Sequence, residues 1–231
     1  MALVIAGVAI GTACTSGNPG GPSDMGSGGS GSGSGTCRTY PTATNVAVTQ
    51  FNTTMTARLT ASFNTSNNTN TITTISATGA TCTTSVDTYR SKDDFVDEVR
   101  VVPGLTLVMA RATTNSPSCG GVNSTVSYAY DSQRRLTSFS TTALGVTGAT
   151  TYTAWDSSGR PTVGGFPGTT IQNVYNDAAR TLTQTQTGGG SVSTSTITYD
   201  ANGNQVTSVV TSGNVTSTTT FTNTATAQVC K

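Results

Sequence analysis

Residues 196–210 read TITYDANGNQVTSVV, and this stretch decides the fold because it holds a complete strand–turn–strand unit. A Thr/Ile alternation leads up to Tyr199, whose ring would end the first strand on the core side and supply much of its buried area. Asp200 fits the opening of a turn because its side chain can accept a hydrogen bond from the backbone two residues on, and Gly203 can adopt a positive φ there. The stretch therefore predicts an antiparallel β-hairpin.

The same frame recurs three times upstream. It consists of an aromatic residue, Asp or Asn, three turn-like residues, Arg or Asn, and then a strand rich in Thr, Val and Leu. The four copies begin at Tyr130-Asp131, Trp155-Asp156, Tyr175-Asn176 and Tyr199-Asp200. The aromatic positions are 25, 20 and 24 residues apart, which leaves room for two strands of about seven residues and two turns. Arg134 and Ala179 replace the turn glycine in two copies, so those two turns are predicted to differ from the others.

These copies resemble the YD repeat of the RHS family, and residues 199–204 are the nearest match. The resemblance covers residues 128–210. In large members of the family, dozens of such hairpins wind into a hollow shell around a toxin. Four repeats cannot close a shell, so the resemblance implies only the hairpin architecture for this chain.

The N-terminal half has a similar texture without clear repeats. Turn signals at Asn67-Asn68, Pro103-Gly104 and 116–121 separate short runs in which Thr alternates with apolar residues. The strands predicted from these runs are 46–52, 56–63, 71–77, 83–89, 95–101 and 105–112. No shift in composition marks a second domain, so residues 37–231 are predicted to form one all-β domain. The expected fold is an antiparallel meander of hairpins in a long curved or half-rolled sheet.

The overall composition excludes several classes of protein. The 231 residues include 51 threonines and only 9% charged residues, which is the reverse of a coiled coil or helical bundle. Eleven basic and ten acidic residues give a net charge of +1, so there is no electrostatic footprint for a nucleic acid. The chain has no histidine, which excludes imidazole catalysis and imidazole metal ligands. We expect no cofactor and no metal.

The first residues indicate an exported protein. Residues 1–13 form an uncharged apolar run that is too short to span a bilayer and is predicted to be a signal peptide. The stretch Gly11-Thr12-Ala13-Cys14 resembles the lipobox of bacterial lipoproteins. This resemblance implies a diacylglycerol-modified Cys14 and, because Thr15 follows it, an outer-membrane destination. The alternative is an ordinary cleaved signal peptide with Cys14 as a stray thiol.

The Gly/Ser-rich tract after Cys14 cannot bury enough apolar surface to fold, so residues 14–36 are predicted to be a disordered, lipid-anchored tether.

The cysteine count also favours an exported, lipid-anchored protein. Five cysteines leave one over if the others form disulfides, and a lipidated Cys14 would account for it. Cys37, Cys82, Cys119 and Cys230 are spaced unlike metal or redox CxxC pairs. They can form two disulfides in three ways, of which we favour Cys37–Cys82 with Cys119–Cys230. The alternative is free buried thiols.

Three charged patterns are candidates for chemistry. Asp93, Asp94, Asp97 and Glu98 form the densest acidic cluster, which could hold Ca²⁺ or serve glycoside hydrolysis as a carboxylate pair. We interpret it instead as a solvated turn and strand start. Residues 200–204 imitate the start of a Ca²⁺ loop but lack its later glycine and glutamate, and a turn explains them.

The third pattern consists of Arg135, Arg160 and Arg180, which follow three of the repeat turns. They could form a stripe that binds sugar acids or another anionic partner. We interpret them as solvent-facing residues that hinder edge-to-edge strand pairing.

Together these features predict a non-enzymatic lipoprotein of the bacterial cell envelope, whose sheet is a binding or structural surface. Its expected partners are the membrane, through the lipid anchor, and a protein or polysaccharide at the cell surface, with no nucleic acid. Three alternatives stay open: an accessory or immunity-type component of an RHS-related competition system, a carbohydrate-active enzyme that uses residues 93–98, and a lipid or lipoprotein carrier.

Overall fold

The computed structural model describes residues 37–100, 107–200 and 203–231. The predicted signal peptide, Cys14 and the tether at 14–36 lie outside these residues. The prediction of an all-β fold is confirmed, since the described part contains fourteen β-strands, one α-helix and one 3-10 turn. The elements are β1 (Cys37–Gln50), β2 (Thr53–Asn64), β3 (Thr69–Ser76), β4 (Thr81–Thr88), α1 (Lys92–Arg100), β5 (Ala110–Asn115), η1 (Pro117–Cys119), β6 (Ser124–Tyr130), β7 (Leu136–Ala143), β8 (Val146–Trp155), β9 (Pro161–Phe166), β10 (Thr169–Asn176), β11 (Thr181–Gly188), β12 (Ser191–Tyr199), β13 (Gln205–Ser212) and β14 (Val215–Cys230).

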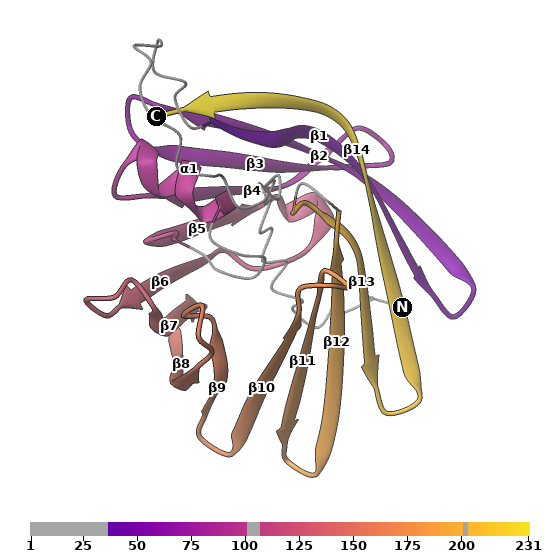
Figure 1. Ribbon diagram of the computed structural model, residues 1–231. Helices are drawn as coiled ribbons and strands as arrows, with labels where there is room; N and C mark the ends of the chain where they lie inside the picture. The colour runs from indigo at the N-terminus through magenta and orange to yellow at the C-terminus, as the bar shows by residue number, and fades with distance from the viewer. Residues whose placement is uncertain (1–36, 101–106, 201–202) are drawn as a thin grey trace, which may run out of the picture.

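The meander closes on itself (Figure 1). Each strand pairs antiparallel with the next one in the chain, as predicted, and β14 returns to pair with β1. The sheet that was expected to be long and curved or half-rolled thus closes completely. The two longest strands, with 14 and 16 residues, meet along almost their whole length, so each described strand has a neighbour on both sides.

The antiparallel order gives the ring two different ends. We call one the repeat-turn end: it carries the first residue of β1, the last residue of β14, helix α1, and the turns after β2, β6, β8, β10 and β12. We call the other the hairpin end: it carries the connections after β1, β3, β5, β7, β9, β11 and β13. Five of these connections are only two residues long, at 51–52, 144–145, 167–168, 189–190 and 213–214.

Threonine suits the strand face that lies opposite the buried one, which we call the outer wall of the ring. Across several strand pairs, threonine hydroxyls on the face opposite the buried one bond to each other, as between Thr49 and Thr54 at 2.9 Å and between Thr142 and Thr147 at 2.8 Å. A β-branched side chain favours the strand, and each pair of hydroxyls shares one hydrogen bond, which leaves a further donor and acceptor sites for other partners. The wall is therefore built with very little charge.

The largest apolar cluster lies at the repeat-turn end and is centred on Phe95 of α1, which is fully buried. The ring of Phe63 stacks on it at a centroid distance of 3.8 Å, and the guanidinium of Arg38 lies 3.9 Å from the same centroid. Tyr40 and Tyr89 meet its edge at 5.4 and 5.3 Å. Phe95 thereby joins β1, β2 and the residue that follows β4 into one packed core.

Helix α1 corrects the prediction of a strand at 95–101. Ser91 Oγ accepts a hydrogen bond from the backbone N–H of Asp94, which caps the helix, and two acidic residues occupy the first turn. The run therefore begins a helix, with Phe95 and Val96 buried on one side. The strand predicted at 105–112 begins only at Ala110. No helix in the described part of the chain is long and apolar enough to cross a membrane.

The disulfides also differ from the favoured pairing. Cys37 bonds to Cys230, and Cys82 bonds to Cys119. Ring closure is the physical reason, because it places Cys37 directly opposite Cys230 in the β1–β14 ladder. Cys82 and Cys119 lie together at the hairpin end, where the backbone N–H of Ser116 donates to the Cys82 carbonyl.

Candidate functional site

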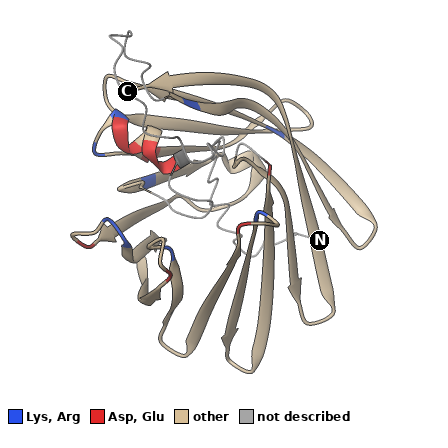
Figure 2. Ribbon diagram, in the orientation of Figure 1, with Lys and Arg blue, Asp and Glu red and all other residues tan. Residues whose placement is uncertain are grey.

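Charge is gathered at one end of the molecule (Figure 2). Among the described residues, every charged residue except Arg58 lies at the repeat-turn end. The hairpin end carries none in the described ranges. This makes the repeat-turn end the candidate functional site that the sequence singled out, since it holds the four repeat turns and the acidic cluster of α1.

The repeat turns have a common construction. The backbone N–H of Asp131 donates to the carbonyl of Arg135, and the same bond joins Asp156 to Arg160 and Asp200 to Asn204. The Asp carboxylate accepts from the backbone N–H four residues on, at 2.8–2.9 Å in all three turns. The other carboxylate oxygen accepts from the side chain of that fourth residue. The bonds among Asp200, Gly203 and Asn204 are those that the interpretation of this stretch as a turn expects.

One of the two turns predicted to differ does not. Arg134 adopts a φ of 63°, in the same region as Gly159 at 80° and Gly203 at 77°, so the first turn keeps its form with an arginine in place of glycine. The third turn does differ, because its positive φ falls on Arg180 and not on Ala179. The Asn176 side chain there accepts from the Ala179 N–H.

Successive repeats are joined by their arginines and aromatic rings. The guanidinium of Arg135 stacks over Trp155 at 4.6 Å, and that of Arg160 stacks over Tyr175 at 4.2 Å. The polar atom of each ring donates to the carbonyl of the residue after the arginine: Trp155 Nε1 to Leu136 at 3.0 Å, and the Tyr175 hydroxyl to Pro161 at 3.1 Å. Each turn is therefore attached to the next one.

The burial of Arg160 contradicts the interpretation of the three arginines as solvent-facing residues. Its residue is only 5% exposed, and its guanidinium bonds to Asp156 at 2.6 Å and to Asp177 of the third turn at 2.7 Å. Burial alone would lower the pKa of Arg160, but these two carboxylates raise it. Arg180, which the shifted third turn takes out of this arrangement, is exposed.

The acidic cluster is a docking point for α1, and not a solvated turn. Glu98 is buried, accepts from the Tyr89 hydroxyl at 2.8 Å and from the Leu107 N–H at 3.1 Å, and pairs with the buried Arg38 at 3.3 Å. Arg38 also donates to the carbonyl of Phe95 at 2.8 Å. Burial raises the pKa of the Tyr89 hydroxyl well above its ordinary value, and the charge of Glu98 adds to the rise.

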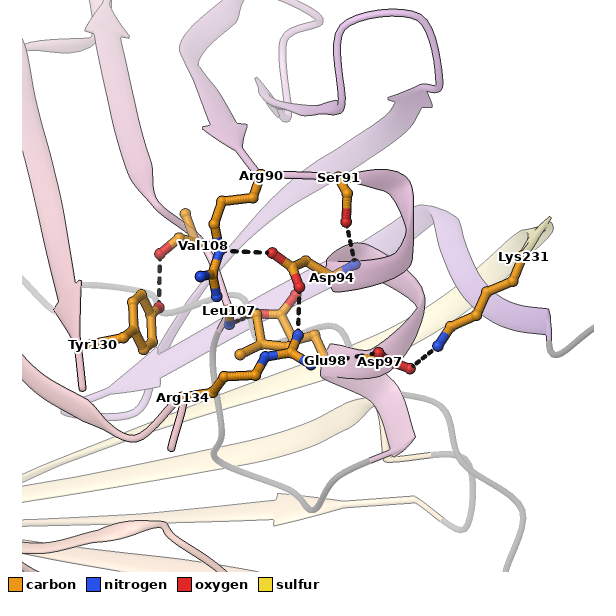
Figure 3. Close-up of polar contacts among 10 residues, drawn as sticks. All are labelled: Arg90, Ser91, Asp94, Asp97, Glu98, Leu107, Val108, Tyr130, Arg134 and Lys231. Carbon is orange, nitrogen blue, oxygen red and sulfur yellow. Dashed lines mark hydrogen bonds and ion pairs between the residues drawn. The ribbon is translucent and has the colours of Figure 1, made fainter. Parts of the chain in front are cut away.

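Two other carboxylates of α1 face the first repeat turn (Figure 3). Asp94 binds Arg90 at 3.0 Å and Arg134 through its other oxygen. Asp97 lies 3.7 Å from Arg134 and 2.5 Å from the ammonium of Lys231. The helix thereby connects the turn after β6 to the end of β14.

A further buried pair crosses β4 and β5. Arg111 bonds to Asp87 through Nε at 2.5 Å and through Nη2 at 2.8 Å, and the two residues are direct cross-strand partners. Burial would lower the pKa of Arg111, but the hydrogen bonds and charge of Asp87 raise it above its ordinary value. Burial also raises the pKa of the nearby Tyr128 hydroxyl.

The structure thus brings the repeat turns and the acidic cluster to one end of the molecule. Their charged side chains form ion pairs with one another there. Of the four carboxylates considered for Ca²⁺ or glycoside hydrolysis, Asp94, Asp97 and Glu98 each face a cation, and Asp93 is exposed. Within the described residues, no three His, Cys, Asp or Glu side chains are grouped closely enough to hold a metal ion.

Sequence reasoning missed the roles of Arg38, Asp87 and Arg111, because isolated charged residues in predicted strands give no signal for pairing. The helix itself had a usable signal in Ser91-x-x-Asp94 before an apolar pair.

No protein-family model and no curated protein matches this sequence.

Proposed function

We propose that this protein is a non-enzymatic, lipid-anchored protein of the bacterial cell envelope, and that its ring of strands is a rigid binding or structural module. The observation that carries the proposal is the cysteine pairing. All four cysteines of the described residues are in disulfides, which leaves Cys14 as the remaining cysteine of the five. A single remaining cysteine directly after an apolar run is what lipid attachment requires, and two structural disulfides are typical of an oxidising compartment.

The distribution of charge supports a role in binding or scaffolding over one in catalysis. A general acid or base needs a carboxylate that can reach a substrate and change its protonation state. Asp94 and Glu98 are buried residues held by arginines and, for Glu98, by a tyrosine hydroxyl. Their contacts fit a structural role in holding α1 to the ring.

The chemistry of the outer wall favours a partner that binds through hydroxyl groups. Rows of threonine offer donors and acceptors on a firm surface with almost no charge, which suits an uncharged polysaccharide or a polar protein surface at the cell surface. Neither the acidic cluster nor the repeat turns offer a comparable free surface for an anionic ligand.

The test is an intact mass measurement on protein extracted with detergent from membranes of producing cells, before and after reduction with alkylation. We expect a mass that fits residues 14–231 plus acyl chains, with four cysteines alkylated only after reduction. A Cys14→Ser variant is the matched control and should lose the acyl mass but keep both disulfides. A lipid-free protein recovered from the water-soluble fraction would overturn the proposal.

A further inference from the structure

The hairpin end carries an unusual set of exposed apolar side chains. In the described part of the chain, eight large apolar residues are strongly exposed, and seven of them lie at this end. We call these seven the apolar rim: Phe51, Met55, Val122, Leu144, Val146, Phe166 and Val192. The eighth, Val174, lies on the outer wall of β10. Large exposed apolar groups that gather in one region indicate a contact surface.

Two members of the rim occupy positions that disfavour them. Phe51 and Leu144 are the first residues of two-residue turns, with φ of 49° and 51°, and are 75% and 82% exposed. Turns with two positive φ angles prefer Asn, Asp or Gly at this place, because a bulky side chain crowds the backbone. Neither solvation nor local conformation therefore explains these residues, and a role outside the folded chain does.

The positions of the tips indicate what kind of surface they meet. In the ring, two hairpin-end connections separate the turn of Phe51 from that of Leu144 on one side and three on the other, so the two tips lie on opposite sides. Figure 1 shows the β1–β2 and β9–β10 tips splayed apart. Apolar groups spread over separate tips suit a broad, deformable apolar surface better than a compact partner with a single pocket.

Charge points to the same surface. The hairpin end has no charged residue in the described ranges, whereas the opposite end holds nearly all of them (Figure 2). A charge-free end can enter the headgroup region of a bilayer without removing an ion from water, and it has no electrostatic attraction to anionic lipid. We propose that the apolar rim docks on the surface of a lipid bilayer, with uncharged or zwitterionic headgroups as the lipid that it recognises.

This docking is compatible with the proposed anchor but does not depend on it. The 22 residues between Cys14 and Cys37 span up to about 75 Å when extended. Strand β14 has 16 residues and therefore measures about 54 Å at most. A tether that starts at the repeat-turn end is thus long enough for the hairpin end to face the same membrane.

The test uses the full chain with Cys14→Ser, so that an anchor plays no part. A single cysteine at Thr53→Cys, beside the Phe51 turn, carries an environment-sensitive fluorophore. A second protein carries the label at Gln133→Cys in the first repeat turn. Both are titrated with phosphatidylcholine vesicles, and with vesicles that also contain an anionic lipid, at low and high salt. We expect a blue shift from the Thr53 label at both salt concentrations and none from the Gln133 label.

The variants give the second half of the test. Phe51→Asn with Leu144→Asn should weaken the partitioning of the Thr53-labelled protein by about tenfold or more, because two apolar tips are lost. Val174→Asn, a matched exposed apolar residue away from the rim, should leave it unchanged. Thermal unfolding of the double variant should occur at or above the original temperature, because Asn suits both turns, so loss of docking cannot be ascribed to unfolding.

Three outcomes would overturn the proposal. The first is a Thr53 label that vesicles do not shift. The second is an equal shift from both labels, which would place the contact outside the rim. The third is binding confined to anionic vesicles at low salt. Loss of the rim's docking would leave the lipid on Cys14, which intact mass reports, untouched.

Discussion

At the residue scale, the clearest energetic conflict is Phe51, a bulky residue with a φ of 49° in a two-residue turn. Phe51→Asn should raise the free energy of unfolding by about 1 kcal/mol, because Asn tolerates this conformation better. Urea denaturation with an unchanged m value would measure the gain. Val174→Asn, in a strand, should show no gain, and an equal effect of both substitutions would contradict the argument from backbone strain.

Glu98 should be as important for stability as any single side chain. Glu98→Gln leaves the charge of Arg38 buried without its partner, so we expect a loss of about 3–5 kcal/mol in the free energy of unfolding. Asp93→Asn, at an exposed residue earlier in the same helix, should stay within about 0.5 kcal/mol. Equal stability of the two variants in urea would mean that α1 is not held through Glu98.

At the scale of elements, the contacts between successive repeat turns predict that their arginines contribute unequally to the free energy of unfolding. Arg160→Gln removes bonds to Asp156 and Asp177 and the stacking on Tyr175, so it should cost about 2–3 kcal/mol. Arg180→Gln, in the exposed third turn, should cost less than about 0.5 kcal/mol. Urea denaturation of both variants tests the difference, and similar midpoints would show that the turns are independent.

The hairpins were predictable because their determinants are local. Tyr130, Trp155 and Tyr199 end strands, as predicted, and the Asp after each of them opens a turn whose bonds reach only four residues. What depends on contacts between distant residues was not predictable: the closure of β1 on β14, the disulfide pairing and the burial of Arg160. Arg160 looks like a surface residue by its neighbours in sequence, and only the third turn, 17 residues away, makes it a buried one.

At the scale of the whole molecule, the two disulfides should contribute different amounts to the free energy of unfolding. Cys37–Cys230 closes a span of 193 residues and Cys82–Cys119 one of 37. In the chain-entropy model, their removal as paired Cys→Ser variants costs about 5 and about 4 kcal/mol, respectively. Thermal unfolding of both double variants would check this order, and a larger loss from the shorter span would contradict it.

The pH dependence of stability should show a broad plateau with two edges, because the chain has no histidine. Hydrogen bonds from Arg135 lower the pKa of Asp131. Burial would raise the pKa of Asp156, but hydrogen bonds from Arg160 lower it below its ordinary value. Stability that depends on these carboxylates is present above about pH 4 and is lost as the pH falls through their lowered values.

The alkaline edge has a separate cause. Burial raises the pKa of Tyr152 and of Tyr199 to about 12, so the unfolded chain releases those protons first. Stability should decline as the pH rises from about 10 towards about 12. Thermal unfolding across the pH range, with phenolate absorbance at the alkaline side, measures both edges. A fall in stability between about pH 6 and 8, where histidine ordinarily titrates, would contradict this account.

The nesting of the two disulfides has a consequence for how the chain matures. Cys37–Cys230 encloses Cys82–Cys119, so a chain that enters an oxidising compartment N-terminus first presents Cys37 and Cys82 together long before Cys230 arrives. A thiol oxidase acting in order of arrival joins these two, and the native pairs then form only by thiol–disulfide exchange. Correct maturation should therefore depend on a disulfide isomerase, and the edge of β1 that faces β14 must stay unpaired until the last strand completes the ring.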